Sequence, residues 1–129
     1  MTTMPVEVTV DAATGVITVV ARGEITLEDL RASFLDTLAH PDFQPGMDVL
    51  LDLTEGGAGG LRPADLREHL NAIDRHRAQR GVNYRVAVVA PRDVDFGVFR
   101  MYGSLADEQA FAVMVFRTRA EAEAWLTPA

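Results

Sequence analysis

The feature that most constrains the fold is a short apolar segment followed by a cluster of glycines. Met47 to Thr54 (MDVLLDLT) is rich in branched apolar side chains, Glu55 to Gly60 (EGGAGG) is mostly glycine, and Pro63 then opens a polar, helix-like pattern. This succession predicts a strand, a flexible loop and a helix. In open α/β sheets, ligands and partners bind beyond the carboxyl ends of the strands. The sequence therefore places the functional region near this loop.

The residues before this strand predict a hairpin and one helix. Residues 6–10 alternate in polarity, residues 16–20 are β-branched, and a turn-like segment separates them. Thr26 is expected to cap a helix that ends at His40, because the residue before a proline avoids the helical region. The apolar stripe of this helix consists of Leu27, Leu30, Phe34, Leu35 and Leu38.

The residues after the glycines predict helices that alternate with strands. A second helix is expected from about Pro63 to Gly81, with a thin core stripe of Leu66, Leu70 and Ile73. The remaining expected elements are a strand at 84–90, a third helix from 93 to about 107, a strand at 111–116 and a closing helix that begins with a Thr118–Glu121 capping box and packs Ala122, Trp125 and Leu126 inward.

This order predicts a single α/β domain over residues 1–129. We expect a five-stranded mixed sheet, in which an N-terminal hairpin precedes three parallel strands, with four helices mostly on one face. Asp48 and Arg85 should then pair on a partly open face, where Leu50, Ala87 and Val89 form an apolar strip. Coverage of that strip by a helix or by the hairpin's own side chains is the alternative, because many α/β sheets are covered on both sides.

The composition excludes several classes of function. The chain has a formal net charge of −7 and no cysteine, and each of its 12 basic residues is an arginine. Thiolate, Schiff-base and phosphate-loop chemistry are therefore excluded, and nucleic acid is a disfavoured partner. No apolar run approaches the ~20 residues that a membrane span needs, so we expect a cytoplasmic protein without stable membrane insertion.

The titratable residues do not predict a catalytic or metal site. On the second helix, the arginines (Arg67, Arg75, Arg77 and Arg80) alternate with acidic residues, which is typical of a solvated face. His69 follows Asp65 by four residues, but His76 lies two further turns away, about 10 Å, too far to share one ion. We therefore expect His69 to be a surface histidine or part of a helix ion pair, and we expect no cofactor and no enzymatic activity.

The third helix is expected to expose aromatic side chains. Its core stripe is predicted to be Val94, Val98, Met101, Tyr102 and Leu105, which leaves Phe96 and Phe99 on another arc beside Gly103. Exposed apolar patches mark binding sites, so Phe96, Phe99 and Arg100 are predicted to form a homodimer or ligand surface near Thr54. In the alternative, Phe99 reaches the core edge and only Phe96 is exposed.

Several segments resemble a known family. The residues concerned are Gly23 to Glu28, Leu51 to Thr54, Arg85 to Val89, Phe99 to Tyr102, and Phe116 to Thr118 with Ala124 to Leu126. They are similar to the SpoIIAA-like family, which is grouped with STAS domains (anti-sigma-factor antagonists) and described as STAS/SEC14-like. The resemblance covers nearly the whole chain. It implies a non-catalytic regulatory module that acts through protein contacts.

The same resemblance suggests where such a module would act. STAS antagonists have a phosphorylatable serine after the strand equivalent to residues 47–53, whereas residues 55–66 here contain neither serine nor threonine. Thr54 is therefore the only candidate for a phosphorylation switch. The mobile loop expected at Glu55 to Gly60 adds the other predicted binding residues: Asp52, Gly56, Gly57, Gly59 and Gly60. The SEC14-like side of the resemblance implies the alternative function, which is binding of a small apolar or lipid ligand.

Overall fold

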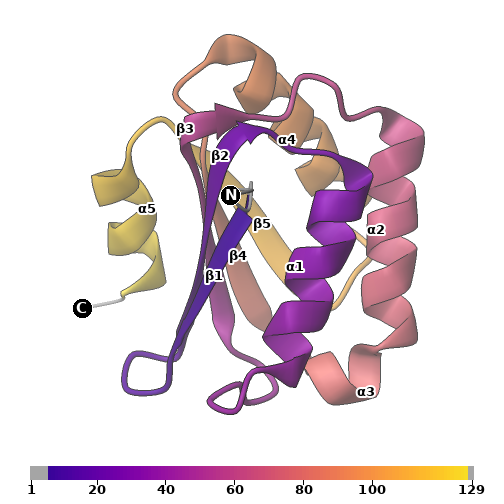
Figure 1. Ribbon diagram of the computed structural model, residues 1–129, viewed down its shortest axis with the longest axis vertical. Coiled ribbons are helices and arrows are strands. Elements are labelled where there is room, and N and C mark those ends of the chain that lie inside the picture. Colours follow the sequence, from indigo (N-terminus) through magenta and orange to yellow (C-terminus); the bar gives the residue numbers. More distant parts are fainter. Residues whose placement is uncertain (1–5, 128–129) are drawn as a thin grey trace, which may run out of the picture.

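The protein is built on one mixed β-sheet with helices on both of its faces (Figure 1). The computed structural model describes residues 6–127. Its strands are β1 (Val6–Asp11), β2 (Val16–Glu24), β3 (Asp48–Gly57), β4 (Tyr84–Val89) and β5 (Phe111–Phe116). Its helices are α1 (Leu27–Ala39), α2 (Pro63–Arg75), α3 (Arg77–Arg80), α4 (Asp93–Leu105) and α5 (Arg119–Leu126). Within residues 6–127, no helix combines the length and the hydrophobicity that a membrane span requires.

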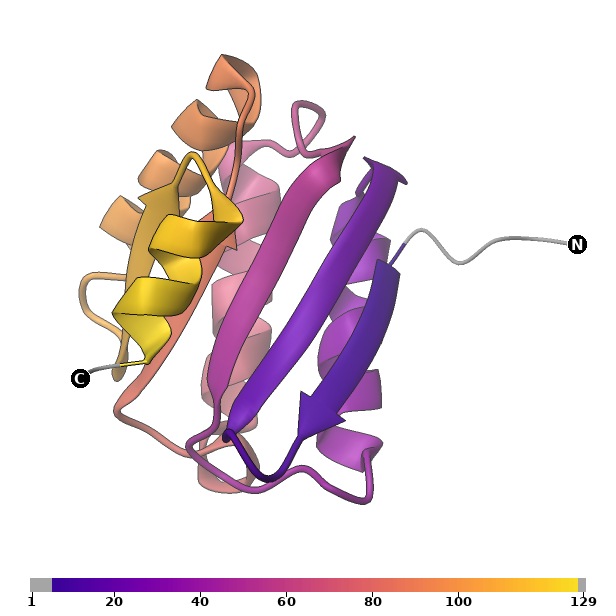
Figure 2. The same ribbon diagram turned by 90° about the vertical axis from the view of Figure 1, so that its left-hand side faces the viewer.

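The strands lie in the sheet in the order in which they occur in the chain. β1 and β2 form an antiparallel hairpin, and the other three neighbouring pairs are parallel. Each crossover between parallel strands steps in the same direction, and such crossovers are right-handed. As a result, α1, α2 and α4 cover the same face of the sheet (Figure 2). The predicted fold, a hairpin followed by three parallel strands with most helices on one face, is confirmed.

Side-chain caps begin two of the helices where the sequence predicted them. The Thr26 hydroxyl accepts a hydrogen bond from the backbone N–H of Asp29, whose carboxylate accepts one from the N–H of Thr26. Thr118 and Glu121 form the same reciprocal pair at the start of α5. Each pair satisfies backbone donors that the first turn of a helix leaves without partners.

The main core lies between the sheet and α1, α2 and α4. Its buried side chains from these helices are Leu30, Leu66, Leu70, Val98, Phe99 and Tyr102, and Ala106 joins them just past the end of α4. The stripe predicted for α1 is wrong at Leu35, which is 47% exposed, while Thr37 is buried. Thr37 is accommodated because its hydroxyl donates to the backbone oxygen of Ser33 at 2.8 Å.

The second face of the sheet is covered in part by α5. Ala122 and Leu126 pack on Leu50, Ala87 and Val89, which are 0–2% exposed. The prediction of an open apolar strip at these three positions is therefore wrong, because the amphipathic closing helix crosses to the face that the other helices leave free.

An ion pair ties α5 to the sheet on this face. Arg85 and Asp48 pair at 3.3 Å, as predicted. Arg85 also donates to the backbone oxygens of Trp125 and Leu126. The last turn of α5 is thereby joined to β3 and β4.

The predicted second helix is divided in two. It ends at Arg75 rather than continuing to Gly81, and the short α3 follows His76. His76 has φ −105° and ψ 19°, which lies outside the helical region, and its Nδ1 lies 2.8 Å from the Ala72 backbone oxygen. This break separates α3 from α2.

The predicted core stripe of α4 is wrong at two positions. Val94 is 54% exposed, whereas Phe99 is 2% exposed and packs edge-to-face on Tyr102 with 5.8 Å between ring centroids. The buried face of α4 consists of Asp95, Val98, Phe99 and Tyr102. These positions follow the i, i+3, i+4, i+7 spacing, so the face that packs is rotated from the expected one. Phe99 is therefore not part of an exposed surface.

The strand expected to end at Thr54 continues through Gly57. Arg22, Gly23 and Glu24 of β2 pair with Glu55, Gly56 and Gly57 of β3. A β-bulge precedes this pairing. Val20 pairs with Asp52 and Arg22 with Glu55, so β3 advances by three residues while β2 advances by two. The prediction of a loop over Glu55 to Gly60 is wrong for its first half, which is strand.

The close packing of these two strands predicts which glycines can be replaced. A Cβ at Gly56 would lie 2.7 Å from the backbone oxygen of Ala21 and 2.9 Å from that of Gly23. We expect Gly56→Ala to lower the free energy of unfolding in urea by roughly 1–3 kcal/mol, because backbone must move to relieve the overlap. Gly60→Ala is the matched control, since its Cβ would meet no atom within 4 Å. Equal stability of the two variants would contradict the β2–β3 packing described here.

Candidate functional site

The carboxyl ends of β2, β3 and β4 meet at one edge of the sheet, near the top of Figure 1. Asp52 lies in β3 near this edge and is 7% exposed. Its Oδ1 accepts from the N–H of Thr54 at 2.8 Å and from the Thr54 hydroxyl at 2.5 Å. Its Oδ2 accepts from Nη1 of Arg119 in the first turn of α5 at 3.1 Å. The structure thus brings together the predicted pair Asp52 and Thr54 and adds Arg119.

The surroundings of Asp52 keep it ionised. Burial raises the pKa of Asp52, but the hydrogen bonds from Thr54 and Arg119 outweigh burial, and the pKa is lowered overall. A carboxylate with this many donors is a poor proton acceptor near neutral pH. Asp52 therefore serves here as an anchor for the end of β3 and the start of α5.

A second buried carboxylate, which the sequence did not single out, ties the edge to α4. Asp95 is fully buried; its Oδ1 accepts from the N–H of Ala58 and its Oδ2 from Nε of Arg92, both at 2.7 Å. Nη2 of Arg92 also donates to Oε1 of Glu24 at 3.0 Å. A side chain at Gly57 would occupy the space of this Arg92–Glu24 pair. One feature of the sequence could have indicated this ion pair. Arg92 lies three positions before Asp95 at the start of a helix, a spacing at which side chains meet.

The predicted aromatic surface of α4 is only partly present. Phe96 is half-buried, and the guanidinium carbon of Arg117 lies 4.0 Å above its ring. Arg100 is exposed, whereas Phe99 lies in the core. The apolar side chain beside the glycine loop is instead Val94, whose Cγ2 would lie 3.4 Å from a Cβ at Gly59. Among the described residues, the exposed apolar group at this edge is thus aliphatic.

A cavity of about 90 Å³ lies between the sheet and α1, α2 and α4. Its walls are mostly apolar, with Val19, Leu51 and Val88 on the sheet and Phe99 on α4. The polar side chains that line it are Ser33, Thr37, His69, Arg80, Tyr84 and Tyr102. No local sequence pattern predicts this cavity, because its walls come from eight elements that only the tertiary fold assembles.

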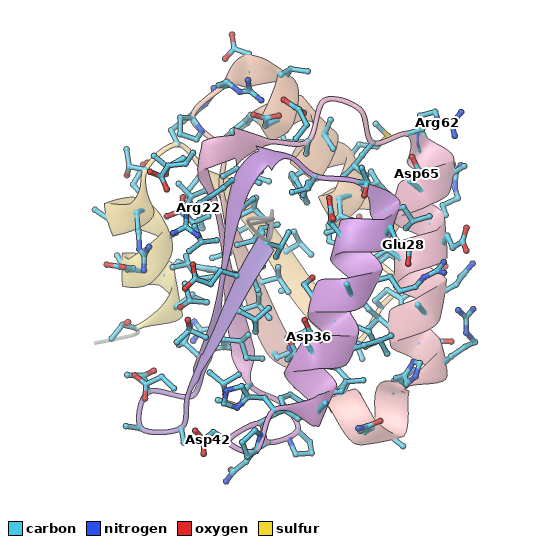
Figure 3. The ribbon with its side chains drawn as sticks, in the orientation of Figure 1. Arg22, Glu28, Asp36, Asp42, Arg62 and Asp65 are labelled. Atoms are coloured by element: carbon cyan, nitrogen blue, oxygen red, sulfur yellow. The ribbon has the colours of Figure 1, made fainter. Side chains whose placement is uncertain are left out.

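Two residues of this cavity were predicted to lie on the surface. His69 is half-buried, with its ring centroid 6.1 Å from that of Phe34 and 6.2 Å from that of Tyr102, and Arg80 is 3% exposed. Asp65, the expected partner of His69, instead caps α2 by accepting from the N–H of Arg62 (Figure 3). The spacing of His69 could have indicated that it is partly buried. It lies three residues after Leu66 and four before Ile73, and therefore on the apolar stripe of α2.

The cavity has the electrostatics of an apolar interior. Burial lowers the pKa of His69 to about 4 and raises the pKa of Tyr84 to about 12. Burial also raises the pKa of Tyr102 and lowers that of Arg80. His69 and both tyrosines are therefore neutral at pH 7, and arginine remains the charged group. Among residues 6–127, no three acidic or histidine side chains are grouped to hold a metal ion.

The lowered pKa of His69 predicts a loss of stability in acid. Between the ordinary value of 6.5 and about 4, the unfolded chain binds a proton that the folded protein does not. The free energy of unfolding should therefore fall as the pH falls through this window, by roughly 1–3 kcal/mol for this residue.

Urea unfolding at pH 7 and pH 4.5 measures this loss. Other groups also titrate in the window, so the comparison is between the protein and its His69→Gln variant, whose stability should fall less. Identical losses in the two proteins, or a His69 ring that titrates near 6.5 by NMR, would contradict a neutral, enclosed imidazole.

Comparison with known proteins agrees with this architecture. A model of the SpoIIAA-like family matches residues 16–127. A crystal structure of an uncharacterized protein from Shewanella loihica PV-4, from the DUF3478 family with a SpoIIAA-like fold, is similar with a TM-score of 0.59 and 18% sequence identity. The similarity covers 95% of this chain and 92% of that one. No curated protein matches the sequence significantly. Since the family match extends over most of the chain, the protein belongs to the SpoIIAA-like family.

Proposed function

We propose that this protein is a non-catalytic regulatory module that binds a protein partner, another protein or a second copy of itself, at the carboxyl edge of its sheet. The observation that supports this most is Val94, an apolar side chain that is 54% exposed beside Gly59 and Gly60, which are also exposed. We call these three residues the edge surface. A small apolar patch bordered by charged groups is typical of the contact region of a protein interface.

The charges around the edge surface support binding rather than catalysis. Asp95 pairs with Arg92, Asp93 with Arg117, and Asp52 with Arg119, at 2.7, 2.7 and 3.1 Å. General acid–base catalysis needs a group whose pKa lies near the working pH and which can reach a substrate. Two of these carboxylates are buried and fully hydrogen-bonded, which suits a rigid binding surface better.

We infer that Thr54 holds Asp52 in place and is not a phosphorylation switch. Its hydroxyl is the donor in the 2.5 Å bond to Asp52. Phosphorylation would remove this donor and add a charge of about −1.5 to −2 next to a carboxylate, which is a repulsive arrangement. Because residues 55–66 contain no serine or threonine, regulation would then depend on the presence of the partner.

Site-specific photo-crosslinking in cells tests the proposed surface. With p-benzoylphenylalanine at position 94, we expect a discrete covalent adduct, because the side chain at this position would lie inside the interface. Adduct mass distinguishes a second copy, which adds another 14.1 kDa, from a different protein. The matched control is position 35 on α1, where Leu35 is also an exposed apolar residue at 47% but lies about two turns along the helix from the end that follows β2.

The two positions give opposite expected results. A discrete adduct at position 94 that is absent at position 35 would support the edge surface. No adduct at position 94, or the same adduct at both positions, would contradict it.

A further inference from the structure

Arg80 is a buried cation without an acidic partner. It is 3% exposed, and its Nη2 donates to the backbone oxygen of Met47 at 2.7 Å. Its Nη1 is buried and has no hydrogen-bond partner among the described residues. The nearby carboxylate of Asp48 pairs with Arg85 instead. The described ion pairs of the protein all involve other arginines, most of them at the surface.

The contacts of Arg80 leave the Nη1 group of its guanidinium without a hydrogen bond to any described residue. The guanidinium carbon lies 3.6 Å from the ring centroid of Tyr84 and 5.6 Å from that of Phe43, and both contacts are cation–π interactions. Such contacts cover the faces of the guanidinium, whereas its N–H groups lie in the plane. Two N–H groups on one side of an arginine form the fork that binds a carboxylate through both of its oxygens.

The other polar groups of the cavity already have partners or are neutral. The Ser33 hydroxyl donates to the backbone oxygen of Leu30, and the Thr37 hydroxyl to that of Ser33. His69 is neutral above its pKa of about 4. Arg80 is therefore the one charged group among the described residues that line this cavity. An apolar cavity with a single buried cation is complementary to a small molecule with an apolar body and one negative charge.

We propose that this cavity binds a small apolar monocarboxylic acid, with its carboxylate on the guanidinium of Arg80 and its hydrocarbon part between the sheet and α4. The volume of about 90 Å³ limits the size of the ligand. An engineered cavity of ~150 Å³ holds benzene, so this smaller cavity fits a short aliphatic acid of about propionate size and excludes an aromatic acid or a long-chain lipid. This inference goes beyond the proposed function, because none of the three edge-surface residues lines the cavity.

Titration with propionate and its neutral isostere propionamide tests the proposal. Binding is followed at pH 7 from the backbone amide NMR signals of Thr37, His69 and Tyr102, which line the cavity. We expect propionate to bind at least tenfold more tightly than propionamide. Arg80→Met should remove this difference, since it replaces the cation by an apolar chain of similar length. Arg75→Met, the same substitution at an exposed position of α2, should leave it unchanged.

A second variant keeps the test independent of the folding of Arg80→Met. Ser33→Phe fills the cavity from α1 and leaves Arg80 in place, so it should abolish binding of propionate while the fold is retained. Equal affinity for propionate and propionamide, propionate binding that survives either cavity variant, or no binding of propionate at all would overturn the proposal. None of these results would affect the proposal that the edge surface binds a partner, because crosslinking at position 94 tests that proposal separately.

Discussion

The pairing of β3 with both of its neighbours is the interaction on which the rest of the structure depends. β3 bonds to β2 and β4, and its side chains are buried on both faces, with Leu50 under α5 and Leu51 and Leu53 in the main core. At its start, the oxygen of Met47 holds Arg80 in the cavity wall. Just past its end, the N–H of Ala58 holds Asp95 at the start of α4. One strand therefore positions both the cavity and the carboxyl edge.

The buried charges show how the two regions differ. Asp52 and Asp95 each have donors for both carboxylate oxygens, so their desolvation is compensated within the protein. These two residues stabilise the ends of strands and the starts of helices, which suits a rigid surface for a partner. Arg80 is compensated only in part, by one backbone oxygen and two aromatic rings. A group that the fold does not satisfy is where a ligand has most to contribute.

Local patterns predicted most of the elements, whereas tertiary contacts decided the extent of β3 and which residues are buried. The capping boxes at Thr26 and Thr118, and the Asp48–Arg85 pair, follow from spacing and alternation along the chain. Gly56 was assigned to a loop because glycine is a poor strand former, yet β2 supplies a backbone partner at a distance that only glycine permits. Phe99 and Arg80 were misplaced because the buried face of a helix depends on what packs against it. The sequence showed that α5 is amphipathic but not which face of the sheet it would cover.

Amide hydrogen exchange measured by NMR tests the role of β3 most directly. If the strand continues through Gly57 and its end is fixed to α4, the N–H of Ala58, which is bonded to a fully buried carboxylate, should exchange far more slowly than that of the exposed Gly60. The N–H of Ile25, which donates to the oxygen of Gly57 at 2.8 Å, should be protected to a similar degree. Rapid exchange at Ala58 and Ile25, at the rate of Gly60, would show that the strand ends near Thr54 and would contradict a preformed edge.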